Sequence, residues 1–323
     1  MMSTIPQFQW FKAVLQVQGS VLPRILPRIL ILCVLSIGMA ATYKMGLWTD
    51  SDNMKALTNN VACNLVLGLL LVFRTNTAYE RYWDGRKAWG LLVITTRNLA
   101  REIQIGIVAP TEEAKAEKER ALKRLLSFAI ATKCHLRQES PVAQLKDLLS
   151  PEDMAQIEKA ERPPQLITFW LSQYLQHQYN NGHIDSRQRL ETNSQVNGLV
   201  EAFSGCERIL KTPMPMSYKI YLKRLTLLYC LILPLGLIEQ LGWWTPWAIT
   251  FVSFVLLGVE EIGNEIEDPF RYGFNNIKLD SICDTLIKDI QTTLSFTEEG
   301  TLKESPALEV TLTDDVPNMV EAV

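Results

Sequence analysis

The sequence predicts an all-α integral membrane protein with four transmembrane helices and a cytoplasmic helical bundle. Two observations indicate this class: long uncharged stretches, and helical spacing of apolar residues in the charged region between them. Of the 323 residues, 47% are hydrophobic and 21% are charged, and the formal net charge is −3. This charge argues against a basic nucleic-acid-binding surface, so we expect a lipid bilayer and no nucleic acid as a partner.

Four uncharged stretches carry the predicted spans. They cover residues 29–43, 56–73, 225–238 and 240–259. A helix crosses the hydrocarbon core with roughly 20 apolar residues, in a range of about 17–25, so the second and fourth stretches suffice alone. The other two need their flanks, where Arg24 and Arg28 can reach toward the headgroups. We predict transmembrane helices at 27–48, 56–75, 224–240 and 243–261. The alternative is two spans plus two buried core helices.

The distribution of Lys and Arg predicts the orientation. Basic residues follow the second span at 74–87 and precede the third at 219–224, whereas the other two loops hold few of them. By the positive-inside rule both termini are cytoplasmic, as are the helical regions 76–223 and 262–295. Segment 296–323 is rich in Asp and Glu, and we expect it to be a flexible tail.

Local signals delimit the cytoplasmic helices. Apolar residues at helical spacing run through 86–107 and 117–137. Ser150 and Pro151 form a typical helix start, and Pro163-Pro164 is expected to end that helix. A capping-box pattern at Asp185 opens a helix toward residue 211, and prolines at 213 and 215 then break the chain.

The sequence contains no pattern typical of an enzyme or a metalloprotein. Its three histidines have no metal-ligand spacing, and its six cysteines form no CxxC pair. No glycine-rich phosphate loop and no nucleophile elbow occurs. We therefore expect no catalytic residue, no bound metal and no cofactor.

The second span carries the first candidate functional feature. Leu65, Leu69 and Phe73 recur every four residues and so share one helix face. A pore wall with a dry constriction that gates by dewetting has this character. Polar residues expected to continue the stripe at its two mouths are Asn60, Asn64 and Arg74. The alternative is a packed stripe whose asparagines bond neighbouring helices.

A cluster of carboxylates directly after the fourth span is the second feature. Glu261, Glu265 and Asp268 share a helix face. Such a cluster is either a cation or proton site, or a set of ion pairs with the arginines of 74–101. The number of arginines in that segment favours the ion pairs.

Two segments resemble signature sequences of bacterial bestrophin homologues. Residues 73–89 read FRTNTAYERYWDGRKAW, and residues 261–270 read EIGNEIEDPF, with Leu279-Asp280 following. The resemblance implies that residues 1–295 form one channel protomer. It further implies a homopentamer around a single central pore that conducts monovalent ions, in the inner membrane of a bacterium.

The resemblance also assigns residues to roles. It places an apolar neck at Leu65, Leu69 and Phe73, and a cytoplasmic aperture at Met214. The family's closing motif falls on Asp268, Pro269 and Phe270. Animal members continue from this motif into an acidic run that binds calcium, but residues 271–278 contain no acid. We therefore expect no calcium activation, because calcium sites need carboxylate ligands.

The sequence leaves the sign of the conducted ion open. Animal members pass chloride and other anions, bicarbonate included, whereas some bacterial members pass monovalent cations. An apolar neck favours neither sign. A non-conducting membrane scaffold or regulatory protein is the alternative function.

Overall fold

A computed structural model describes residues 15–17, 19–47 and 60–296. The chain divides into two compact units, and each is described by itself. Unit 1 contains the described residues up to Tyr82 together with 213–268 and 273–275. Unit 2 contains 83–212, 269–272 and the described residues from Asn276 onward. The predicted tail, apart from residue 296, lies outside the described residues.

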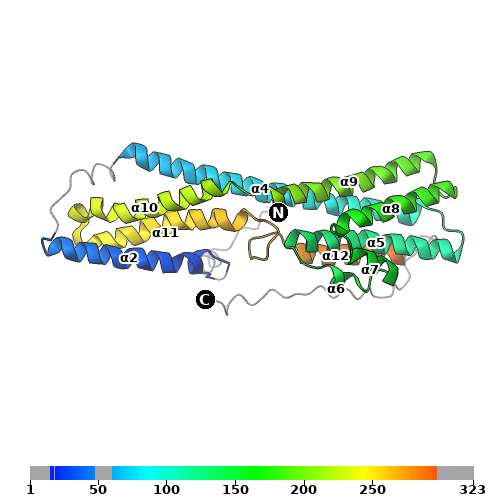
Figure 1. The fold of residues 1–323 in the computed structure, drawn as a ribbon, viewed down its shortest axis with the longest axis horizontal. Helices are drawn as coiled ribbons and strands as arrows, with labels where there is room; N and C mark the ends of the chain where they lie inside the picture. The colour runs from blue at the N-terminus through cyan, green and yellow to red at the C-terminus, as the bar shows by residue number, and fades with distance from the viewer. Residues whose placement is uncertain (1–14, 18, 48–59, 297–323) are drawn as a thin grey trace, which may run out of the picture. The chain divides into compact units, whose positions relative to one another are not determined.

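Unit 1 is built from apolar helices. They are α2 (Leu22–Lys44), the first part of α4 (Val61–Arg101), α10 (Met216–Leu241) and α11 (Thr245–Ile266). Helices α2, α10 and α11 lie side by side and pack on one another (Figure 1). Their shared core consists of the buried side chains of Ile25, Ile29, Leu32, Cys230, Leu233, Ile249 and Leu257.

Within the described residues, three continuous helical stretches are long and apolar enough to cross a membrane, namely 22–44, 61–106 and 216–266. The third has 51 residues and contains a 3₁₀ turn at Gly242–Trp244, where α10 ends and α11 begins. Gly242 has a φ of 52°, a conformation that glycine adopts without strain, so the chain reverses here and α11 contacts α10. The sequence therefore correctly predicted two apolar helices in this stretch.

Helix α4 is longer than the sequence signals indicated. The span predicted at 56–75 and the apolar stripe at 86–107 belong largely to one helix that runs to Arg101. A single π-helical turn, Glu102–Gly106, follows it. The intervening segment 76–85 contains no proline, so nothing interrupts the backbone hydrogen bonds. Residues 56–59 of the predicted span lie outside the part of the chain that the structure describes.

Unit 2 is a helical bundle. Its elements are the rest of α4, α5 (Glu112–Arg137), α6 (Val142–Leu145), α7 (Pro151–Ile157), α8 (Pro163–Asn180), α9 (Ser186–Lys211) and α12 (Leu279–Ser295). Helix α5 packs against both α8 and α12, and α8 packs against α9. Among the large side chains that are less than 2% exposed are Trp89, Leu92, Leu122, Leu125 and Phe128.

Two of the predicted helix starts are confirmed at the level of hydrogen bonds. Ser150 Oγ accepts a bond of 3.2 Å from the backbone N–H of Asp153. At Asp185 both bonds of a capping box with Gln188 are present. The prediction for Pro163-Pro164 was wrong, since α7 already ends at Ile157 and these prolines open α8. Proline suits a first helical turn because its missing N–H would be unpaired there in any case.

The Pro269-Phe270 part of the closing motif packs on α4 at Gly85. Phe270 is fully buried. A Cβ atom on Gly85 would lie 2.9 Å from Pro269 Cγ and 3.2 Å from Phe270 Cζ. Glycine is therefore needed here for close approach between helix and loop.

We expect Gly85→Ala to lower the free energy of unfolding by about 1–3 kcal/mol, because the added methyl group overpacks this contact. Gly90→Ala is the matched control on the same helix, since a Cβ there meets no atom within 4 Å. It should be neutral or stabilise by about 0.5–1 kcal/mol through helix propensity. Unfolding of both variants in detergent is the measurement. Equal stability of the two variants would contradict the close contact at Gly85.

Candidate functional site

Helix α4 presents three large apolar side chains on its exposed face. Leu65, Leu69 and Phe73 are 68%, 50% and 55% exposed. On the opposite face Leu67 and Leu71 are each 4% exposed. The three residues recur at spacings of four, so they form a continuous ridge along one side of the helix. We call Leu65, Leu69 and Phe73 the α4 ridge.

The asparagines expected to continue the stripe do not lie in line with it. Asn64 directly precedes Leu65, and one residue turns a helix by about 100°, so Val61 occupies the aligned position. Val61 is 77% exposed. Asn60 caps the helix instead, because its Oδ1 accepts bonds of 2.9 Å and 3.3 Å from the N–H groups of residues 62 and 63. The ridge is therefore apolar to its upper end.

Arg74 was expected at the lower mouth, but its side chain is only 1% exposed. It follows Phe73 by one position, and the same rotation of about 100° turns it toward α11. Its Nη1 donates to the backbone oxygen of Glu260 at 3.1 Å and lies 3.4 Å from the carboxylate of Glu260. Its Nη2 donates to Asn264 and lies 3.9 Å from Glu267. Arg74 therefore ties α4 to α11 and is not part of the ridge.

The carboxylates after the fourth span form ion pairs inside unit 1. Besides Arg74, their partners are two residues of α2 and one of α10. Arg24 lies 3.7 Å from Glu265, and Arg28 lies 3.5 Å from Glu261. Glu267 also pairs with Lys219. These ion pairs join Arg24, Arg28, Arg74, Lys219, Glu260, Glu261, Glu265 and Glu267 into one cluster.

This cluster contains four basic and four acidic side chains, so it has no formal net charge at neutral pH. Glu261 and Glu265 are therefore ion-paired as expected, but their partners are Arg24 and Arg28 of α2. From the segment 74–101 that was expected to supply the partners, Arg74 pairs with Glu260 and Glu267. Sequence reasoning missed Arg24, Arg28 and Lys219 as partners. Their separation from the carboxylates, which reaches 241 residues between Arg24 and Glu265, leaves no local signal.

Met214 does not present its side chain to solvent. It is 9% exposed, whereas Met216, just after Pro215, is 71% exposed. The aperture at Met214 stays a prediction, because it depends on how protomers assemble around a pore.

A second buried charge cluster lies in unit 2 at Asp280. Lys133 Nζ, on a side chain that is 0% exposed, donates to Asp280 Oδ1 at 2.9 Å. Arg137 donates to the same carboxylate and stacks on the ring of Tyr272 at 3.9 Å. Burial raises the pKa of Asp280, but hydrogen bonds from Arg137 and Lys133 outweigh it and hold the pKa below the ordinary value. Lys133 was missed, although a lysine within the apolar run of α5 was a usable signal.

Comparison with known proteins gives a consistent result. The family model described as "Bacterial/Fungal Bestrophin protein" matches residues 2–292. A voltage-dependent anion channel-forming protein from Nostoc sp. is 41% identical over 287 residues, covering 89% of this chain and 92% of that protein. A protein of the same description from Synechocystis sp. is 39% identical over 286 residues, covering 87% and 91%.

A solved structure is also similar. The crystal structure of a bacterial bestrophin homologue from Klebsiella pneumoniae matches with a TM-score of 0.75 at 26% sequence identity. The match covers 84% of this chain and 98% of that chain.

We expect Arg74→Gln to lower the free energy of unfolding by about 3–5 kcal/mol, because it removes the one buried cation of the cluster and leaves Glu260 and Glu267 with only the more exposed Arg28 and Lys219 as partners. Arg28→Gln is the matched control, since Arg28 also pairs with Glu260 but is 51% exposed. An exposed pair contributes about 0–1 kcal/mol. Thermal unfolding in detergent measures the stability of the two variants. A similar loss of unfolding free energy in both would contradict the conclusion that Arg74 is the buried centre of the ion-pair cluster.

Asp280→Asn tests the cluster in unit 2. Removing this carboxylate leaves Lys133 buried and unpaired, so we expect a loss of about 3 kcal/mol or more at pH 7. A pKa that is lower in the folded state gives stability above the unfolded-state pKa, and this stability is lost as pH falls through the folded value. The difference from wild type should therefore shrink below about pH 4. Asp284→Asn, at an exposed position of α12, is the control. A pH-independent difference would contradict this assignment.

Proposed function

The chain belongs to the bacterial bestrophin family, and on this premise we propose that it is a passive channel for small monovalent anions such as chloride. The observation that carries the proposal is the α4 ridge. Three large apolar side chains, each at least half exposed, need either lipid or a pore beside them. On the same helix face, one turn after Phe73, Asn76 is exposed and donates to Glu80 at 3.0 Å. A face that passes from apolar to polar suits a pore wall that opens into water.

We place five copies of the α4 ridge around one central axis, as the family resemblance implies. Leu65, Leu69 and Phe73 then form three apolar rings that constitute the neck of the pore. An apolar constriction loses its water when it is narrow and conducts when it is slightly wider. We therefore propose that the neck is the gate of the channel.

The ion pairs of unit 1 bear on the sign of the ion. Carboxylates near residue 260 would favour cations only if they were unpaired, and the cluster they form has no formal net charge. Similar proteins in Nostoc and Synechocystis are described as anion channel-forming. Both observations support anions. Cation conduction is the second candidate, favoured by the exposed carboxylate of Glu80 on the face of the ridge.

We further propose four membrane crossings in the inner membrane, with both termini cytoplasmic. The turn between α10 and α11 supports this topology. Trp243, Trp244 and Trp247 are 53%, 71% and 72% exposed there, and Lys44 at the end of α2 lies 5.5 Å from the ring of Trp243. Exposed tryptophans beside a lysine are typical of the headgroup region. This turn then lies at the membrane surface opposite the cytoplasm.

The test is electrical recording from the purified full-length protein in planar bilayers under a potassium chloride gradient. We expect a reversal potential near the chloride equilibrium potential. Replacing Leu65, Leu69 and Phe73 together by Ala should raise the conductance severalfold, because smaller side chains widen and wet the neck. The matched control replaces three exposed apolar residues of α2 by Ala, namely Leu30, Val34 and Ile37, which are 55%, 66% and 45% exposed. This control variant should leave the conductance unchanged.

Each other outcome overturns a defined part of this proposal. A reversal potential near that of potassium would assign cation conduction and direct attention to Glu80. Unchanged currents in the α4 variant would remove the ridge from the pore. Silence of the reconstituted protein would favour the alternative, a membrane scaffold or regulatory protein.

A further inference from the structure

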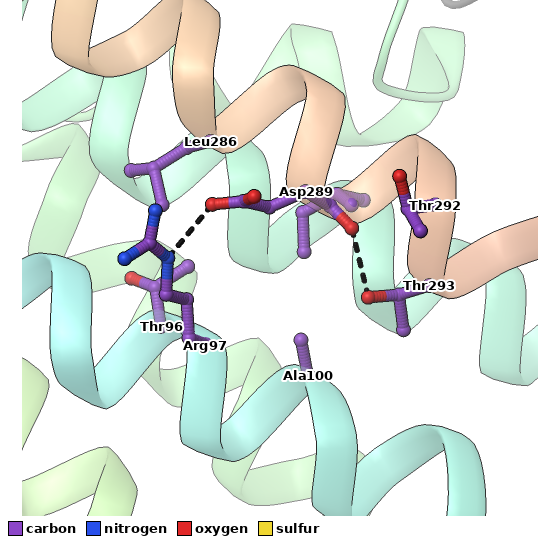
Figure 2. Close-up of a pocket in the computed structure, with 8 residues that line it drawn as sticks. Thr96, Arg97, Ala100, Leu286, Asp289, Thr292 and Thr293 are labelled. Carbon is purple, nitrogen blue, oxygen red and sulfur yellow. Dashed lines mark hydrogen bonds and ion pairs between the residues drawn. The ribbon is translucent and has the colours of Figure 1, made fainter.

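Unit 2 contains a pocket between α4 and α12 that the proposed channel activity does not use. Its volume is about 220 Å³, and one side opens to solvent. Figure 2 shows Arg97 of α4 and Asp289 of α12 facing each other across it, with an ion pair of 2.7 Å between Arg97 Nε and Asp289 Oδ2. Apolar lining comes from Ala100, Leu286 and Ile290, none more than 2% exposed.

The charged pair in this pocket retains unused hydrogen-bonding capacity. The side chains of Arg97 and Asp289 are 49% and 36% exposed. Among the described residues, neither η nitrogen of Arg97 and neither lone pair of Asp289 Oδ1 is engaged in a hydrogen bond. Arginine can bind a carboxylate through two parallel N–H groups, and the free carboxylate oxygen can accept from an ammonium group.

Thr96 supplies an independent observation. Its side chain lines the pocket and is 0% exposed, yet its hydroxyl has no hydrogen-bond partner among the residues that the structure describes. Leaving a buried hydroxyl unpaired costs about 1–3 kcal/mol, so such groups call for an explanation. The hydroxyl oxygen has less than 1 Å² of accessible surface, so a polar ligand would become its partner once a neighbouring side chain shifts.

We propose that this pocket binds a small zwitterionic amino acid, with its carboxylate on the η nitrogens of Arg97 and its ammonium group on Asp289. A simple anion would lie beside the charge of Asp289, and a simple cation beside that of Arg97. A zwitterion aligned antiparallel to the pair satisfies both groups. The volume of about 220 Å³ leaves room for a molecule the size of alanine, whose methyl group would lie toward the apolar side of the pocket.

The test is calorimetric titration of the full-length protein in nanodiscs with L-alanine. Acetate and methylammonium are titrated separately, because acetate carries only the carboxylate of the zwitterion and methylammonium carries only its ammonium group. We expect L-alanine to bind, and each half-ligand to bind at least about tenfold more weakly. The readout is binding and does not depend on conduction, so the fate of the channel proposal leaves it unaffected.

Three variants test the contacts. Arg97→Gln and Asp289→Asn should each weaken L-alanine binding by at least about tenfold. Arg101→Gln is the matched control, because Arg101 lies one turn further along α4 and pairs with Glu102 at 3.0 Å outside the pocket. Thr96→Val should weaken binding while thermal stability stays equal or rises, since the methyl group removes an unpaired hydroxyl. If Thr96 has only a structural role, the substitution changes thermal stability and leaves the affinity for L-alanine unchanged.

Several results would overturn the proposal. These are no binding heat with L-alanine up to about 10 mM, acetate binding as tightly as L-alanine, or equal affinities of Arg97→Gln and Arg101→Gln. Acetate binding of that strength would identify an oxyanion site in place of an amino acid site.

Discussion

A guanidinium group that is 1% exposed must be neutralised within the protein, because an unpaired buried charge costs several kcal/mol. In unit 1 the guanidinium group is that of Arg74. Its partners are Glu260 and Asn264 of α11 and Glu267, which directly follows that helix. Arginine suits the place, since its fork of N–H donors can bond several oxygens at once. The contact fixes the rotation of α4 about its own axis. The exposure of Leu65, Leu69 and Phe73 follows from that rotation.

The same cluster explains why an acidic sequence segment does not make an acidic surface. Arg24 and Arg28 are about half exposed, and they cover the outer side of carboxylates that are nearly buried. Lys219 reaches Glu267 from α10. Within the described part of unit 1, α2, α4, α10 and α11 each supply charge to one neutral cluster. Helices α2, α10 and α11 also share an apolar core, and the ion pairs of Arg74 attach α4 to α11.

The sequence predicted features that depend on a few neighbouring residues. The helix starts at Ser150 and Asp185 and the break between the spans predicted at 224–240 and 243–261 were correct, because caps and turns act over three or four positions. Spacing by four correctly placed Leu65, Leu69 and Phe73 on one face. The continuity of α4 was missed, since residues 76–85 carry no strong pattern of their own. Ion partners far apart in sequence, such as Arg28 and Glu261, depend on tertiary packing.

The link between Arg74 and α11 also restricts how the proposed neck can open. Phe73 and Arg74 are adjacent, so rotating α4 enough to turn the Phe73 ring away would pull the guanidinium from its carboxylates. Breaking such a pair costs about 3–5 kcal/mol, which would leave an opening of that kind rarely populated. Moving α4 and α11 together keeps every bond of Arg74. Widening of the neck is therefore expected as a joint displacement of these two helices, with the ion pairs of unit 1 intact.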